Sequence, residues 1–276
     1  MAMDRLRHRT ELLRDESARL LSYLETVPLE AMDQPSACER WQVSHVVTHL
    51  GSAVQSHCRA MSRGMEGLSD PPQQAAPPQP GISASEGIAR NAIALRERLG
   101  GQMVSTLRDR YTELFELLEA ISSADLAKPC WHPRGIILVG DYTDLLLQEL
   151  AIHGWDACSN RDKDYHMGSA MAQEMVDVAQ RWLELGFHTS TQRAQAVRYR
   201  FDLSDGPAVQ QVVEDGVVRR ESTDSGEADV TFRCSAETYV LLIYGRLTAG
   251  SLKPERLSSA GDAGLAAELW GSLGHR

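Results

Sequence analysis

A glutamate and a histidine one helical turn apart, Glu149 and His153, are the residues of this chain whose types and spacing best suit chemistry. In the segment DYTDLLLQELAIHGWDAC, a rotation of about 100° per residue places both on one face, flanked by Leu145 and Leu146 and in line with Tyr142. An ionised carboxylate on an apolar face costs several kcal/mol unless it has a partner. A divalent metal bound by both side chains would be such a partner, and a Glu–His hydrogen bond without metal is the alternative.

A metal site needs at least one more ligand, and the histidines of an earlier helix are the candidates. The segment from about Trp41 to Gly64 has apolar residues at three- and four-residue steps and contains His45, His49 and His57. His57 lies in the middle of the apolar stripe, His49 at its edge and His45 towards the polar side. His45 and His49 also form an HxxxH pair, which is a metal-ligand spacing in its own right. The residues alone therefore predict a metal site without choosing its full set of ligands.

The elements that must position these residues are helical through most of the chain. Apolar periodicity predicts helices over about 4–26, 41–64, 84–121, 139–158 and 169–187. The third of these would break at Gly100-Gly101. Five prolines make the stretch 69–81 a loop, and Pro129 and Pro133 bracket another. Five helices with one long connection are typical of a four-helix bundle with an extra packing helix.

The pattern of the chain changes near residue 190. VRYRFDL alternates apolar and polar residues, QQVVEDGVVRRES contains a hairpin-like Asp215-Gly216, and ADVTFRC is again strand-like. A helical stretch over about 236–246, a glycine-rich turn and a final helix from about 261 follow. We therefore expect an α plus α+β fold, with a helical bundle over 1–188 and a small α/β domain over 189–276.

Composition limits the partners of this protein. The chain has 276 residues, of which 42% are hydrophobic, and a net charge of -10. An acidic surface repels phosphate backbones, so we expect no nucleic-acid partner. No run approaches the roughly 18 apolar residues of a membrane-spanning helix, and the charged N-terminal segment lacks the apolar stretch of a secretory signal. We expect a soluble cytoplasmic protein without a membrane partner. Its five scattered cysteines, which form no CxxC pair, are expected to be free thiols.

Segments at both ends of the chain resemble the mycothiol-dependent maleylpyruvate isomerase family, whose helical part is a DinB-like metal-binding four-helix bundle. CERWQVSHVVTHLGSAV is similar to the start of the family's second helix, where a Trp and a short aliphatic run precede His-Leu, as Trp41 and His49-Leu50 do here. ELAIHGWD matches the family's second motif, which is Glu-x-x-x-His-x-x-Asp-like. ADVTFRC, YVLLIYGRL and SAGDAGLAAEL resemble the sterol-carrier-protein-like α/β domain that often follows the bundle.

The resemblance implies a set of metal ligands and a thiol cosubstrate. The ligands carried over position by position are His49, Glu149 and His153, whereas His45 and His57 have no ligand counterpart in the motif. The thiol is mycothiol, with bacillithiol and glutathione used by relatives. Two histidines and a carboxylate leave at least one position of a Zn²⁺ ion open, which is typical of a catalytic site. Coordination would favour the thiolate form of a thiol whose pKa is ordinarily about 8.5.

The function implied is a mycothiol-using S-transferase or isomerase that acts on an electrophilic small molecule. The same site would serve an exchange of thiols on a natural-product intermediate. A hydrolase with metal-bound water as nucleophile and a metal-binding protein without turnover are further alternatives, and nickel or manganese suits the same donors.

Three other residues, Arg246, Tyr142 and Asp156, take expected roles around this site. Arg246, at the family's Gly-Arg position, is expected to bind an anionic substrate, with a surface or domain-interface arginine as the alternative. Tyr142 is expected to line the pocket or to pack in the core. Asp156 is expected to accept a hydrogen bond from a ligand histidine or to form a helix-end salt bridge. We expect the five tryptophans, Trp41 included, to be structural.

Overall fold

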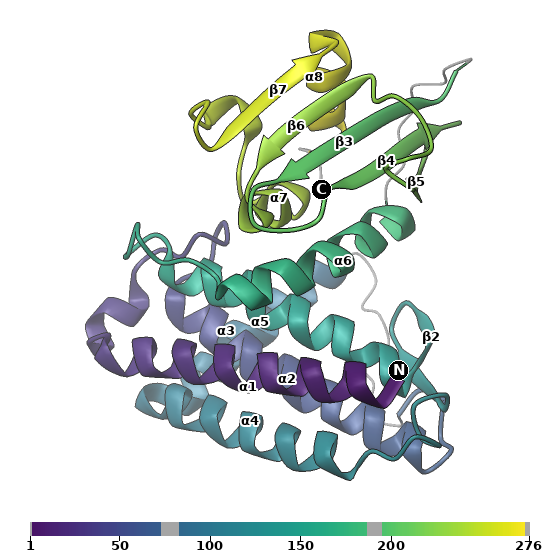
Figure 1. Cartoon of the computed structure of the whole chain (residues 1–276). Coiled ribbons are helices and arrows are strands. Elements are labelled where there is room, and N and C mark those ends of the chain that lie inside the picture. The colour runs from purple at the N-terminus through teal and green to yellow at the C-terminus, as the bar shows by residue number, and fades with distance from the viewer. Residues whose placement is uncertain (1, 73–82, 187–194, 274–276) are drawn as a thin grey trace. The chain divides into compact units, whose positions relative to one another are not determined.

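A computed structural model describes residues 2–72, 83–186 and 195–273 of the chain. It divides into two compact units, Met1–His166 and Met167–Arg276, which follow one another along the colour scale of Figure 1. The first unit is mainly helical and the second contains a mixed sheet with helices, so the predicted fold class is confirmed. None of the helices in these ranges combines the length and the apolarity that crossing a membrane requires. Most of the predicted loop 69–81 lies outside the described residues.

The first unit is a helical bundle (Figure 1). Its helices are α1 (Ala2–Thr26), α2 (Val43–Met65), α3 (Ala84–Leu99), α4 (Met103–Ala120) and α5 (Tyr142–Cys158), joined in part by the short 3₁₀ turns η1 (Leu29–Asp33), η2 (Gly100–Gln102) and η3 (Val139–Asp141). α1 and α2 each pack against α4 and α5, and α3 packs against α2. Gly100 ends α3 with a left-handed φ of 53°. The predicted break in the third helix is therefore confirmed.

The core of the bundle follows the predicted periodicity. Val46, Val47 and Leu50 of α2 are fully buried, as are Leu147 and Leu150 of α5. Burial of each such side chain contributes about 1.5–3 kcal/mol. Because these residues recur at three- and four-residue steps, their burial fixes which faces of α2 and α5 meet, and with them the polar side chains on the same faces.

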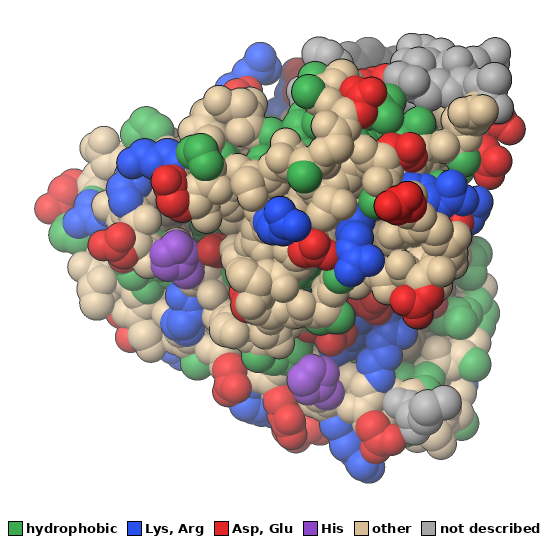
Figure 2. All heavy atoms as spheres, turned by 45° about the horizontal axis from the view of Figure 1, so that its top comes forward, with side chains coloured by type: hydrophobic (Ala, Val, Ile, Leu, Met, Phe, Trp, Pro, Cys, Tyr) green, Lys and Arg blue, Asp and Glu red, His purple; other side chains and the backbone are tan. Residues whose placement is uncertain are grey.

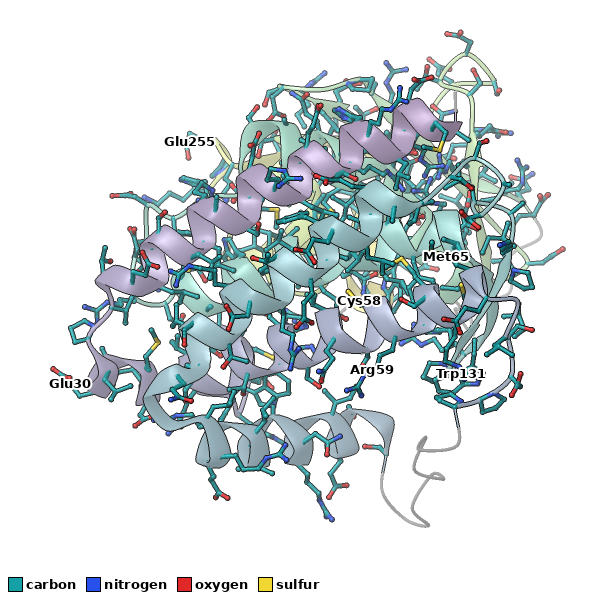
Figure 3. The ribbon with its side chains drawn as sticks, turned by 90° about the horizontal axis from the view of Figure 1, so that it is seen from below. Glu30, Cys58, Arg59, Met65, Trp131 and Glu255 are labelled. Atoms are coloured by element: carbon teal, nitrogen blue, oxygen red, sulfur yellow. The ribbon has the colours of Figure 1, made fainter. Side chains whose placement is uncertain are left out.

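Between α4 and α5 the chain forms a hairpin, where we expected a loop bracketed by prolines. Its strands β1 (Pro129–His132) and β2 (Gly135–Leu138) pair in antiparallel register. Pro129 only begins β1 and Pro133 lies in the turn, two positions that proline tolerates. β1, which carries Trp131, lies beside the C-terminal end of α2 near Met65 (Figure 3). This close approach depends on Gly64, since a Cβ added there would collide with Sγ of Cys130.

The second unit is built on a five-stranded sheet in the order β5-β4-β3-β6-β7. The strands are β3 (Val197–Leu203), β4 (Val209–Glu214), β5 (Val217–Glu221), β6 (Val230–Cys234) and β7 (Leu257–Gly261), and the helices are α6 (Ser169–Gly186), α7 (Ala236–Ile243) and α8 (Ala263–Leu273), with a 3₁₀ turn η4 (Ala249–Ser251). β3 and β6 are parallel, and the other neighbours are antiparallel. The predicted hairpin at Asp215-Gly216 is confirmed, with φ of 50° and 79° as a two-residue turn requires.

Helix α6 groups with a different unit from the one in which the sequence placed it. From the sequence we placed its residues, as the fifth predicted helix, in the bundle over 1–188. Instead α6 packs against α7 and β5, and it groups with the second unit, which begins at Met167. An amphipathic pattern shows that a helix has a buried face but does not identify the surface that covers it.

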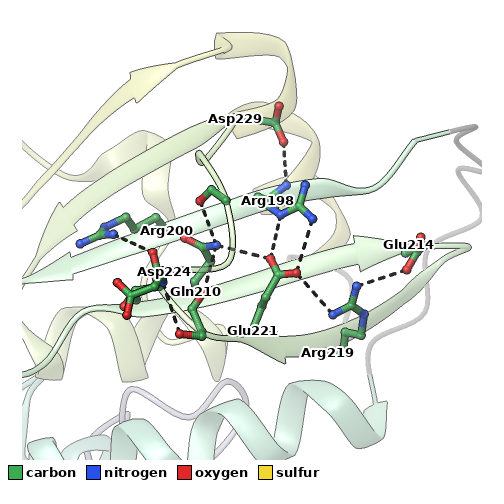
Figure 4. A network of polar contacts seen from close by, with 11 residues as sticks. Arg198, Arg200, Gln210, Glu214, Arg219, Glu221, Asp224 and Asp229 are labelled. Carbon is green, nitrogen blue, oxygen red and sulfur yellow. Dashed lines mark hydrogen bonds and ion pairs between the residues drawn. The ribbon is translucent and has the colours of Figure 1, made fainter.

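Aromatic side chains fill the core of the second unit, and ion pairs cover part of its sheet. Phe201 and Phe232 stack with centroids 5.0 Å apart. Nε of Arg198 on β3 donates to Glu221 on β5 at 2.8 Å, and Arg219 joins this network (Figure 4). Ion pairs at the solvent-facing side of a sheet are screened and each adds little to the stability, whereas burial of the aromatic core adds much more. On the face drawn in Figure 2, acidic and basic side chains are intermingled.

Replacing Gly64 by alanine should lower the free energy of unfolding by about 1–3 kcal/mol, because the new Cβ would force β1 away from α2. Gly87 on α3 is the matched control, since an added Cβ there meets nothing within 4 Å. Its replacement by alanine should stabilise the helix by about 0.5–1 kcal/mol. Urea unfolding followed by circular dichroism measures both variants. A Gly64→Ala protein as stable as wild type would contradict the close contact.

Candidate metal centre

The residues of the candidate site come from the N-terminal third of α2 and the middle of α5. His49 lies on α2, and Glu149, 100 residues further along the chain, lies one turn before His153 on α5. The two helices pack through their buried apolar faces, with Leu50 next to His49 and Leu150 next to Glu149. This packing brings the predicted ligands together.

Nitrogen atoms of both histidines approach one carboxylate oxygen. Nε2 of His49 lies 3.0 Å from Oε2 of Glu149, and Nε2 of His153 lies 3.6 Å from the same atom. Ligand atoms of the three residues all lie within 4.8 Å of one another, and the imidazole rings meet edge to face. The side chains of His49, Glu149 and His153 are 12%, 21% and 17% exposed. The cluster is therefore largely shielded from water but remains accessible from solvent.

The charge of Glu149 dominates the electrostatics of the cluster. Burial raises the pKa of Glu149, but the hydrogen bond with His49 and the charges of the neighbouring histidines outweigh burial and lower it to about 2. The carboxylate is thus ionised at neutral pH between two imidazole rings. One carboxylate oxygen and two imidazole nitrogens are donors that suit Zn²⁺ and several other divalent ions. The residues present therefore fit a bound metal ion.

Asp156 orients His153 through a hydrogen bond to the ring nitrogen that faces away from Glu149. Its side chain is fully buried, and its Oδ2 lies 2.9 Å from Nδ1 of His153. A neutral imidazole carries one proton, so this hydrogen bond places it on Nδ1 and leaves the lone pair on Nε2, the nitrogen near Glu149. The expected hydrogen bond between Asp156 and a ligand histidine is present.

Two residues that the sequence did not assign to the site lie directly against it. Trp41 stacks on His153 with ring centroids 6.2 Å apart, and it meets His49 edge to face at 5.1 Å. The expectation that this tryptophan is only structural is therefore incomplete, although its position in the matched motif was a signal. Cys38, half-buried in the same loop, forms a second group with His153 and Asp156 whose ligand atoms lie within 4.8 Å of one another.

Hydrogen bonds tie this loop to α5 and to the residues that follow it. The amide of Ala37 donates to the carbonyl of Asp156 at 2.9 Å, and the side chain of Asn160 donates to the carbonyl of Ser36 at 2.6 Å. Arg40 adopts a left-handed φ of 66°, which is costly for a residue with a side chain. The loop is thus fixed in one strained conformation beside His153.

The other candidate histidines do not join the cluster. Nδ1 of His45 accepts a hydrogen bond from the amide of Gln42, so His45 completes the N-terminal cap of α2. His57 packs edge to face on Tyr142, and its buried Nδ1 has no hydrogen-bond partner among the described residues. Only His49 of the three lies against Glu149 and His153 at ligand spacing in the described ranges.

The residues that we expected to contact substrate have local partners. The hydroxyl of Tyr142 donates to the carbonyl of Trp131, and the side chain is 1% exposed. Arg246 lies in the second unit, directly after α7 and Gly245, and its guanidinium donates to the carbonyl of Tyr244 at 3.1 Å. Contacts of Tyr142 and Arg246 with a substrate stay predictions.

Both units match models of known domain families. Residues 13–158 match the mycothiol maleylpyruvate isomerase N-terminal domain, and residues 173–268 match the C-terminal domain of the same protein type. No curated protein gives a significant sequence match.

Solved structures agree with this assignment at the level of the fold. A crystal structure of a mycothiol-dependent maleylpyruvate isomerase aligns with a TM-score of 0.62 and 15% identity over 94% of each chain. A histidine-to-alanine mutant of this type of enzyme aligns with a TM-score of 0.61 and 14% identity, again over 94% of each chain. A sterol carrier protein 2-like protein of Aedes aegypti aligns with 38% of this chain and 98% of its own, at 21% identity and a TM-score of 0.28. The last score is too low to support an inference, and the second unit is assigned by its family model.

The titration of His57 should make the stability of the protein depend on pH. Burial lowers the pKa of His57 from 6.5 to about 4. Between these values the unfolded chain binds a proton that the folded chain does not, so stability is fully present above about pH 6.5 and is lost as the pH falls towards 4. His57→Gln should therefore lose less stability than wild type between about pH 7 and about pH 5.

Urea unfolding at the two pH values measures this difference. His8→Gln, at an exposed position on α1, is the control and should follow the wild type. If His57→Gln lost as much stability as the wild type on acidification, the imidazole would not be buried in its neutral form.

Proposed function

The chain belongs to the mycothiol maleylpyruvate isomerase family. From this premise we propose that it is a metal-dependent S-transferase or isomerase whose cosubstrate is a low-molecular-weight thiol, mycothiol. The observation that carries the proposal is the approach of two histidine Nε2 atoms to one ionised carboxylate oxygen, at 3.0 and 3.6 Å. His49, Glu149 and His153 would hold a divalent cation, Zn²⁺ in this proposal. Such an ion, when bound, favours the thiolate form of a thiol over the neutral form.

The protein residues would prepare this site for a charged sulfur. Glu149 is ionised, and the hydrogen bond from His153 to Asp156 keeps the Nε2 lone pair available. Trp41 stacks on the ring of His153 and meets the ring of His49 edge to face, which would limit the water that reaches both rings. A thiolate in such a shielded site loses much of its hydration and is a stronger nucleophile than in water.

The reaction proposed is addition of the thiol sulfur to an electrophilic carbon of a small molecule. A carbon–sulfur bond forms, and the proton released from the thiol ends on the electrophile. Retention of this bond gives a conjugate, whereas elimination of the thiol after rotation gives an isomer. Exchange of one thiol for another uses the same two half-reactions. In this proposal Arg246 binds an anionic group of the substrate through its planar guanidinium, and Tyr142 contributes to the wall of the pocket.

Metal content with and without thiol tests the proposal. Purified wild type should hold about one Zn²⁺ per chain, and His49→Ala, Glu149→Ala and His153→Ala should each lose it, because two ligands bind a cation far more weakly than three. X-ray absorption should show a sulfur neighbour of the metal after mycothiol is added. His45→Ala, which removes a histidine of the same helix that caps its N-terminus, is the control and should keep the metal.

Two other results would contradict the proposal in different ways. Stoichiometric metal without a sulfur neighbour would favour a hydrolase or a protein that only binds metal. Folded wild type that takes up no metal would leave Glu149 and the two histidines as a buried polar cluster. Circular dichroism of each variant separates loss of metal from loss of fold.

Replacing Asp156 by asparagine should weaken metal binding by about 10–100-fold without removing a ligand, because the charge that supports His153 is lost. Asp164→Asn, at an exposed position beyond α5, is the matched control and should bind metal like the wild type. Competition with a chromophoric chelator measures both affinities. Equal affinities of Asp156→Asn and wild type would show that Asp156 does not support the site.

A further inference from the structure

We propose that Cys38, His153 and Asp156 form a second cation site, which competes with the first because the two sites share His153. Ligand atoms of these three residues lie within 4.8 Å of one another. The group combines a thiol, an imidazole nitrogen and a fully buried carboxylate, which differs in chemistry from the two histidines and one glutamate of the first site. The sites lie at opposite nitrogens of the same imidazole ring.

The positions around His153 support two sites rather than one larger one. Its Nε2 lies 3.6 Å from Oε2 of Glu149, and its Nδ1 lies 2.9 Å from Oδ2 of Asp156. The two nitrogens of an imidazole point away from each other across the ring, so a cation bound to one cannot contact the other. A cation between Cys38 and Asp156 would therefore take the place of the proton on Nδ1.

The loop that carries Cys38 is held in place before any cation binds. The amide of Cys38 donates to Oγ of Ser36 at 3.1 Å, and the carbonyl of Cys38 accepts from the amide of Trp41 at 3.0 Å. The amide of Ala37 donates to the carbonyl of Asp156. A ligand fixed by its own backbone loses little conformational entropy on binding, as a preformed site requires.

The donors select the class of cation. Thiolate sulfur favours soft and borderline ions such as Cd²⁺, Cu⁺ and Zn²⁺ over Mg²⁺ and Ca²⁺. Cys38 is in no disulfide and is partly exposed, so a cation from solvent reaches it. A bound cation would also neutralise the charge of Asp156, which is 0% exposed. A thiophilic cation is therefore the ligand that this group fits.

Sharing one imidazole makes the sites mutually exclusive. A neutral imidazole bound to a cation through Nδ1 carries its proton on Nε2 and has no lone pair there for a second cation. Occupation of the second site would thus remove His153 from the first metal centre. This step rests on the proposed function, in which His153 is a ligand of that centre. An excess of a thiophilic cation would inhibit the enzyme through a residue, Cys38, that is no ligand of the first site.

Cadmium added to metal-free protein without any thiol cosubstrate tests the second site directly. Sulfur-to-cadmium charge transfer absorbs in the ultraviolet, so a bound cysteine ligand has a signature that is independent of activity. Wild type and His49→Ala, which lacks only the first site, should both show the absorption. Cys38→Ser should lose it. Cys58→Ser is the matched control, because Cys58 is also a partly exposed thiol outside disulfides, and should keep it.

No absorption in wild type, or an undiminished absorption in Cys38→Ser, would overturn the second site. Competition is tested by adding Cd²⁺ to zinc-loaded protein and measuring the zinc released. Each increment of absorption should be matched by released zinc, with about one cation per chain in total. Absorption that develops while the zinc stays bound would overturn the sharing of His153. These outcomes are separate from the proposed function, since zinc loading and the sulfur neighbour are measured without cadmium.

Discussion

An ionised carboxylate held between two packed helices must be matched by hydrogen-bond donors or positive charge, and Glu149 imposes this condition where α2 meets α5. In the described structure His49 meets this condition with its Nε2 at 3.0 Å from the carboxylate oxygen, and Nε2 of His153 lies beside the same oxygen at 3.6 Å. His153 is in turn held by Asp156, whose own carbonyl receives the amide of Ala37. The loop before α2 is thus linked to the carboxylate of Glu149 through a chain of contacts. The same charge makes the cluster attractive to a cation.

The parts of the site that the sequence could predict are those that lie within one helix. Glu149 and His153 share a face because of their spacing, whatever α5 packs against. The choice of His49 over His57 depends on how far α2 is rotated and shifted against α5, which a helical wheel does not contain. His57 lies nearer the centre of the apolar stripe, yet it packs on Tyr142, further along the pair of helices. His49 was chosen over His57 because of the resemblance to a family, and hydrophobic periodicity did not contribute to this choice.

What the sequence did not predict depends on contacts between distant segments. α6 has the amphipathic pattern of a bundle helix, and only its partners, α7 and β5, place it in the second unit. Trp41 was assigned to the core because large aromatic residues usually are. Trp41 lies in a loop, and a loop has no hydrophobic periodicity from which the surface that its ring contacts could be predicted. Cys38 gave no signal for the same reason, since the residues beside it belong to a helix far along the chain.

The side chains of the proposed metal centre come from helices that lie 100 residues apart in the chain, and this separation bears on the lifetime of the protein. The unfolded chain offers no preformed set of the three donors, so a cation at the proposed site would bind the folded chain and shift the folding equilibrium by mass action. Folding stability would then rise with the free metal concentration around the protein. During metal starvation the empty chain would open more often and be cleared sooner by proteases. The abundance of the enzyme would therefore follow the cellular metal supply without any dedicated regulator.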